Sequence, residues 1–106
     1  MIKIDLSELV KSPETNSISG RSFGEKFAVS KKLLDHVQQN EKILIVIDDS
    51  KVKAINDSFI KGFFSQVFEK LKTREKVKAL IEIQANNYYV RLFDKNWTIL
   101  EAINKA

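Results

Sequence analysis

The segment from Lys42 to Leu71 constrains the fold most strongly, because it combines the most apolar strand pattern of the chain with its most regular helical pattern. The unbroken apolar run from Ile43 to Ile47 is mostly β-branched and predicts a central strand that is covered on both faces. After a polar turn and a short extended link, Val52 to Ile55, apolar side chains return at helical spacing: Phe59, Ile60, Phe63, Phe64, Val67, Phe68 and Leu71. The segment therefore predicts a buried strand followed by a helix with one broad apolar face.

Length and composition predict a single domain that spans residues 1–106. A chain of 106 residues with 43% hydrophobic content is large enough for one core and too small for two. The absence of cysteine excludes disulfides and thiolate metal sites. No apolar run approaches the roughly 20 residues of a membrane span, and the opening MIKIDLSE lacks the basic and apolar regions of a signal peptide. We therefore expect a soluble, cytoplasmic protein without a membrane contact or a cofactor.

The charge pattern leaves two classes of partner open. A formal net charge of +4 permits weak attraction to nucleic acid. The basic residues are mixed with acidic ones along the whole chain, without an arginine-rich run, so a protein partner is the main expectation and a small nucleic-acid-associated protein is the alternative. The single histidine, His36, and the lack of a nucleophile-elbow or phosphate-loop pattern predict that the protein is not an enzyme.

The residues before Lys42 predict one strand, one long loop and one helix. Ile2, Ile4 and Leu6 alternate with polar residues, as in an edge strand with one solvated face. The segment from Val10 to Gly20, which holds Pro13, predicts a loop with a short strand near Thr15 to Ile18. Ser22 and Glu25 match a capping box that opens a first helix, and its apolar face continues to a helix end near Gln39.

The residues after Leu71 predict a third strand and a third helix. Lys70 to Lys78 is expected to be a charged connection, and Ala79 to Ile83 a short strand. A C-terminal helical stretch opens at Asn86, with an interruption near Lys95 and Asn96. The whole order predicts a small α/β domain with a mostly parallel or mixed four-stranded sheet and about three helices.

Candidate site residues cluster where open α/β sheets place their sites, beyond the carboxyl end of a strand and at the start of a helix. Ser58 has two interpretations that the sequence leaves open. It is either a helix-capping residue, worth about 1 kcal/mol, or an exposed phosphoacceptor whose modification adds about −1.5 to −2 charges. The predicted partner-binding surface consists of Arg21, Asp49, Ser50, Lys51, Asn56, Asp57, Ser58 and Lys61.

Three stretches carry a resemblance to a known family: IKIDLSE at the start, SGRSFGEKF at 19–27 and VIDDSKVKAINDSFIKGFF at 46–64. Together they resemble the STAS-like domain family of bacterial proteins, and more distantly the STAS domain of anti-sigma factor antagonists. The resemblance implies a non-enzymatic regulatory domain that binds an intracellular partner such as a kinase-like ATPase of the anti-sigma type. It also implies phosphorylation of Ser58, although Asn56-Asp57-Ser58-Phe59 stands here where the antagonists carry Asp-Ser-Ser-Gly.

Overall fold

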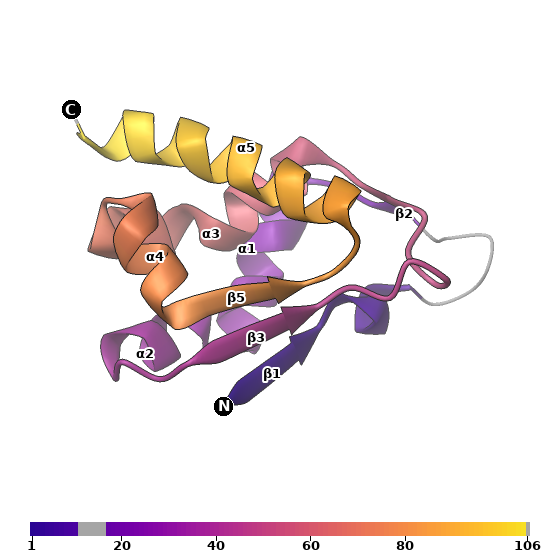
Figure 1. The fold of residues 1–106 in the computed structure, drawn as a ribbon, viewed down its shortest axis with the longest axis horizontal. Helices are drawn as coiled ribbons and strands as arrows, with labels where there is room; N and C mark the ends of the chain where they lie inside the picture. The colour runs from indigo at the N-terminus through magenta and orange to yellow at the C-terminus, as the bar shows by residue number, and fades with distance from the viewer. Residues whose placement is uncertain (11–16, 106) are drawn as a thin grey trace.

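The computed structural model describes residues 1–10 and 17–105 (Figure 1). Within this part, three parallel strands form one sheet in the order β1-β3-β5, and two further strands form a separate parallel pair. The three-stranded sheet consists of β1 (Ile2–Asp5), β3 (Ile43–Val46) and β5 (Ile81–Gln84), and the pair consists of β2 (Ser17–Ile18) and β4 (Ala54–Ile55).

The described residues also form five α-helices and one short 3-10 helix. They are η1 (Leu6–Leu9), α1 (Arg21–Ser30), α2 (Leu33–Gln38), α3 (Asp57–Leu71), α4 (Arg74–Leu80) and α5 (Asn87–Lys105). The predicted α/β class is confirmed, but the prediction of one four-stranded sheet with three helices is wrong in its details. The radius of gyration of 12.9 Å is that of one compact domain of this length. Among the described residues, no helix is both long enough and apolar enough to cross a membrane.

The three-stranded sheet is covered on one face only. Ile43 and Ile45 are fully buried, whereas Leu44 and Val46 between them are only half-buried. Successive side chains of a strand point to opposite faces, so β3 has one covered face and one partly solvated face. Figure 1 shows the helices on one side of the sheet. The prediction that β3 is covered on both faces is therefore wrong, because the helices form a single layer.

The predicted core around α3 is confirmed. Its four central apolar side chains, Phe63, Phe64, Val67 and Phe68, are each at most 1% exposed and belong to the same core as Ile43, Ile45 and Ile47. Four phenylalanine rings on α1 and α3 stack or tilt against one another, with Phe59 and Phe63 5.9 Å apart between centroids. The apolar face of α3 therefore holds the helices to the sheet.

The predicted first helix is divided into α1 and α2. Lys32 adopts the left-handed conformation with a φ of 55°, which no continuous helix accommodates. The start also differs from the prediction, because Gly20 is the residue before the first turn and no side chain in the described part of the chain caps this helix. Ser22 lies inside α1, so the predicted capping box does not form. Pro13 and the predicted strand start at Thr15 lie outside the described residues.

Two predictions near the C-terminus are also wrong. The charged connection contains α4, whose first turn is capped by the Thr73 side chain, and β5 therefore begins at Ile81 and not at Ala79. Helix α5 runs without interruption through Lys95 and Asn96. Asn96 is fully buried, and its side-chain amide donates to the carbonyl of Leu92, so this polar residue packs inside the fold and does not break the helix.

Helices α1 and α3 approach each other closely at two glycines. A Cβ on Gly24 would lie 2.8 Å from the backbone nitrogen of Phe63, and one on Gly62 would lie 2.9 Å from the backbone carbonyl carbon of Arg21. Real Cβ atoms essentially never come within 3.0 Å of such atoms, so only glycine permits this spacing. The two glycines thereby bring the first turns of α1 and α3 together.

Candidate functional site

Ser58 lies where the starts of α1 and α3 meet. The side-chain oxygen of Asn56, the cap of α3, accepts hydrogen bonds from the Ser58 amide at 2.8 Å and from the Ser58 hydroxyl at 2.6 Å. The same hydroxyl accepts a hydrogen bond of 3.3 Å from the backbone amide of Gly20. Ser58 is half-buried, so its hydroxyl both belongs to the cap of α3 and links that helix to the start of α1.

The strands β2 and β4 deliver the two helix starts to the same place. Ser17 and Ile18 pair in parallel with Ala54 and Ile55, and the Asn56 amide donates to the Ile18 carbonyl at 2.7 Å. Directly after this pair, Gly20 adopts a φ of 104°, a conformation that favours glycine. Among the described residues, no side chain caps α1, and the amide of Gly20, the residue before its first turn, lies 3.3 Å from the Ser58 hydroxyl.

Asp57 is held from the side of α5. Its carboxylate accepts a hydrogen bond of 3.1 Å from the Asn96 amide and lies 3.3 Å from the Lys95 ammonium. The hydrogen bond from Asn96 is the main reason why the pKa of Asp57 lies below its usual value, with Lys95 and Lys61 adding to the effect and burial opposing it. The negative charge of Asp57 is therefore already engaged by two side chains of α5.

Arg21 and Phe23 on α1 complete this surface. The backbone of Arg21 lies against Gly62 of α3, while its side chain is exposed. The Phe23 side chain is 43% exposed, and its ring centroid lies 5.8 Å from that of Phe59. An exposed aromatic side chain next to an arginine is the composition that protein interfaces favour. We call Arg21, Phe23, Asp57, Ser58 and Lys61 the α1–α3 surface.

Sequence reasoning missed the exposed position of Phe23. Phe23 and Phe27 are four residues apart and both belong to the apolar face that the sequence predicts for the first helix, so their spacing does not distinguish them. Buried Gly24, Phe27 and Ala28 define the centre of the covered face, and at about 100° per residue Phe23 lies near its margin. The burial of Gly24, which has no side chain to signal it, was the missing piece of information.

The predicted loop residues Asp49, Ser50 and Lys51 belong to a different part of the molecule. Ser50 donates through both its amide and its hydroxyl to Asp48, and the hydroxyl bond is the main cause of a lowered Asp48 pKa. Asp49 accepts a hydrogen bond of 3.0 Å from Asn86, just before α5 begins. Asp57 contacts Asn96, which lies ten residues after Asn86. At a rise of 1.5 Å per residue, about 15 Å of α5 therefore separates the two contacts. The structure thus brings Arg21, Asn56, Asp57, Ser58 and Lys61 together and leaves the loop apart.

No family model matches this chain, and neither a curated protein nor a solved structure matches it. Within residues 1–10 and 17–105, no three histidine, aspartate or glutamate side chains are grouped to hold a metal ion. The fold and the site define the chain as a small α/β protein with a one-sided parallel sheet and a mixed aromatic and charged surface at the joined starts of α1 and α3.

Proposed function

We propose that this chain is a non-enzymatic regulatory domain that binds an intracellular protein partner through the α1–α3 surface and is switched by phosphorylation of Ser58. The proposal keeps the STAS-like interpretation of the sequence, in which the partner is a kinase-like ATPase or another regulatory protein. The observation that carries it is the position of the Ser58 hydroxyl, which joins the caps of two helices within a surface that contains an exposed phenylalanine and an exposed arginine.

A phosphate on Ser58 would act on both helices. The modified oxygen no longer carries a hydrogen for Asn56, so the 2.6 Å bond of the α3 cap is lost. The dianion is attracted by the amide ends of α1 and α3, whereas the neighbouring Asp57 repels it. The added phosphate also takes up space beside the Gly20 amide, which lies 3.3 Å from the Ser58 oxygen, so we expect the start of α1 to shift relative to α3 and to carry Arg21 and Phe23 with it. Modification at one hydroxyl would in this way alter the whole docking surface.

The surface suggests the chemistry of its partner. Asp57 is already engaged by Lys95 and Asn96, so the groups that remain for a partner are the Arg21 guanidinium, the Lys61 ammonium and the Phe23 ring. A partner patch that offers carboxylates around an apolar pocket fits these groups, because arginine pairs with carboxylates in a planar fork and aromatic side chains fill pockets at interface centres. A phosphate on Ser58 would repel the same carboxylates.

A photo-crosslinking experiment in cells tests the location of the surface. A photoreactive phenylalanine analogue replaces Phe23, and in a matched control it replaces Ile103, which is 63% exposed near the end of α5. We expect one discrete partner to be linked from position 23 and not from position 103. Combined Arg21→Glu and Lys61→Glu substitutions should abolish the product, whereas Lys70→Glu on the last turn of α3 should not. Identical products from both positions would place the interface elsewhere.

A further inference from the structure

A groove runs between β5 and α5, on the opposite edge of the sheet from β1. Its volume is about 310 Å³, at the lower end of the range for ligand pockets and sufficient for one or two side chains. Its walls are mainly apolar: Ile81, Ile83, Val90, Phe93 and Trp97. The charged side chains of Lys78, Arg91 and Asp94 complete the lining.

Among the described residues, the strand beside this groove has one edge with which no other strand pairs. Strand β5 pairs with β3 on one side only, and the Gln84 carbonyl accepts from the Ile47 amide at 3.0 Å. In a parallel ladder, backbone groups alternate between the two sides of a strand, so the amide and carbonyl of Ile83 point away from β3. The Ile81 amide already donates to the Val77 carbonyl, which leaves the Ile81 carbonyl and both polar groups of Ile83 for a further strand.

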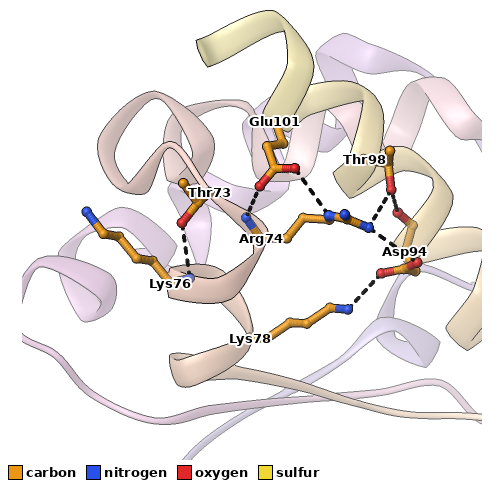
Figure 2. A network of polar contacts seen from close by, with 7 residues as sticks. All are labelled: Thr73, Arg74, Lys76, Lys78, Asp94, Thr98 and Glu101. Atoms are coloured by element: carbon orange, nitrogen blue, oxygen red, sulfur yellow. Dashed lines mark hydrogen bonds and ion pairs between the residues drawn. The ribbon is translucent and has the colours of Figure 1, made fainter.

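The groove has an excess of positive charge once the ion pairs within the protein are set aside. Asp94 lies 2.9 Å from Lys78 and 3.8 Å from Arg74, while Arg74 also pairs with Glu101 at 3.3 Å. Figure 2 shows how these side chains lie between α4 and α5. This network joins α4 to α5, and the charges of its acidic and basic side chains balance each other. Arg91 lies outside the network, is exposed, and has no carboxylate within ion-pair distance among the described residues.

A second hollow continues the groove toward the start of β5. It has a volume of about 260 Å³, shares Lys78 and Ile81 with the groove, and is also lined by Glu82 and by Lys42, whose ammonium donates to the Ala79 carbonyl. Arg91 lies on the first turns of α5, which follow the carboxyl end of β5, while Lys42 precedes β3. The two cations therefore lie toward opposite ends of the β5 edge, with the apolar walls between them.

We propose that this edge binds an extended partner segment as a fourth strand beside β5, with apolar side chains in the groove and carboxylates at both ends. The free backbone groups of Ile83 supply main-chain pairing, the groove accepts alternate side chains, and Arg91 and Lys42 select acidic flanks. A second copy of the chain fits less well, because it would bring its own α4 and α5 to the same edge. A single extended segment brings no helices of its own to this edge.

The only tryptophan of the chain, Trp97, lines the groove and reports on its occupancy. The probe is the blocked peptide Glu-Glu-Val-Thr-Val-Glu-Glu, titrated into the whole protein while Trp97 emission is recorded. We expect a saturable change, with affinity lowered about tenfold by Arg91→Glu and unchanged by Lys70→Glu or by Arg21→Glu. Retained affinity in Arg21→Glu would separate this edge from the α1–α3 surface.

Two N-methylated forms of the peptide test the strand pairing itself. Each form carries methyl groups on one of the two alternating sets of amides, so that only one form removes the donors that face β5. We expect one form to lose binding and the other to retain it. Equal binding of the two forms, equal affinities of Arg91→Glu and Lys70→Glu, or no change in Trp97 emission would overturn the proposal. Self-association that Ile83→Pro abolishes would also overturn it in favour of a second copy.

Discussion

Substitution of Gly62 by alanine tests the close approach of α1 and α3 on which the α1–α3 surface depends. The added Cβ would lie 2.9 Å from the carbonyl carbon and 3.1 Å from the Cα of Arg21, and closer still to its carbonyl oxygen. All of these atoms are backbone, so no side chain can rotate away and one helix must shift. Overpacking of a well-packed core usually costs 1–3 kcal/mol. Because this contact joins two backbones, we expect a cost at the upper end of that range, about 3 kcal/mol.

The helix propensity of alanine offsets part of this cost. Replacement of glycine by alanine inside a helix stabilises it by about 1 kcal/mol, so the free energy of unfolding should fall by about 2 kcal/mol in total. For a domain of this size, this corresponds to a melting temperature lower by about 8–16 °C. Urea denaturation followed by circular dichroism and by Trp97 fluorescence measures the change, with exposed Gln66→Ala on the same helix as the control, expected within about 0.5 kcal/mol of wild type. A Gly62→Ala protein as stable as the wild type, or more stable, would refute the close packing of α1 and α3.

Three further perturbations test the core and the titrating groups. Phe64→Ala should lower the free energy of unfolding by about 3–5 kcal/mol, and a loss below about 1 kcal/mol would contradict the placement of α3. The pKa of Glu101 lies below its usual 4.5, mainly because the Arg74 amide donates to it, so its stabilising contribution is present above the unfolded pKa and is lost as the pH falls through the folded value. Glu101→Gln should therefore flatten the acid side of a stability profile, and an unchanged slope would count against the contact. Burial raises the pKa of Tyr89 above 10.0, so the free energy of unfolding should decline as the pH rises beyond about 10. Tyr89→Phe should abolish this decline. It should also lower the free energy of unfolding by about 1 kcal/mol, because the 3.0 Å hydrogen bond to the Val52 carbonyl is lost.

The strand and helix between Lys42 and Leu71 could be predicted because their signals are local. Strand β3 appears as a β-branched run, and α3 as apolar residues at helical spacing ended by polar ones. The start of α3 was placed correctly, since short polar residues before an apolar helix are typical caps, but the residue that caps it is Asn56, and Ser58 lies inside the first turn. These features depend on neighbours within one or two turns of the same element.

Features that depend on distant neighbours could not be predicted. The half-buried state of Leu44 and Val46 depends on whether helices cover one face of the sheet or both. The apolar run in the sequence is the same for a sheet covered on one face and for a sheet covered on both. The extended pieces that contain β2 and β4 were predicted, but their pairing with each other was not, because it joins distant segments over only two residues on each side. Lys32 adopts a left-handed conformation that its residue type does not predict.

The same distinction applies to the candidate site. The hydrogen bond from Gly20 to Ser58 joins residues 38 positions apart, and that from Asn96 to Asp57 joins residues 39 positions apart. Asn96 suggested a helix interruption, because asparagine is a weak helix former. Its buried contact with Asp57 outweighs that preference, and only the packing of α5 against α3 reveals it.

The affinity of the partner for the protein with phosphoserine incorporated at position 58, compared with unmodified protein, tests the central claim most directly. The partner is the one linked from position 23, and calorimetry or surface-based binding measures both affinities, with unmodified Ser58→Ala as a control for the loss of the hydroxyl. The account predicts a ten- to hundred-fold weaker complex for the phosphorylated protein, because the dianion repels the partner's carboxylates and disturbs the junction of α1 and α3. Ser58→Ala should bind about as well as the wild type. Equal affinities of the phosphorylated and unmodified proteins would contradict the proposed switch.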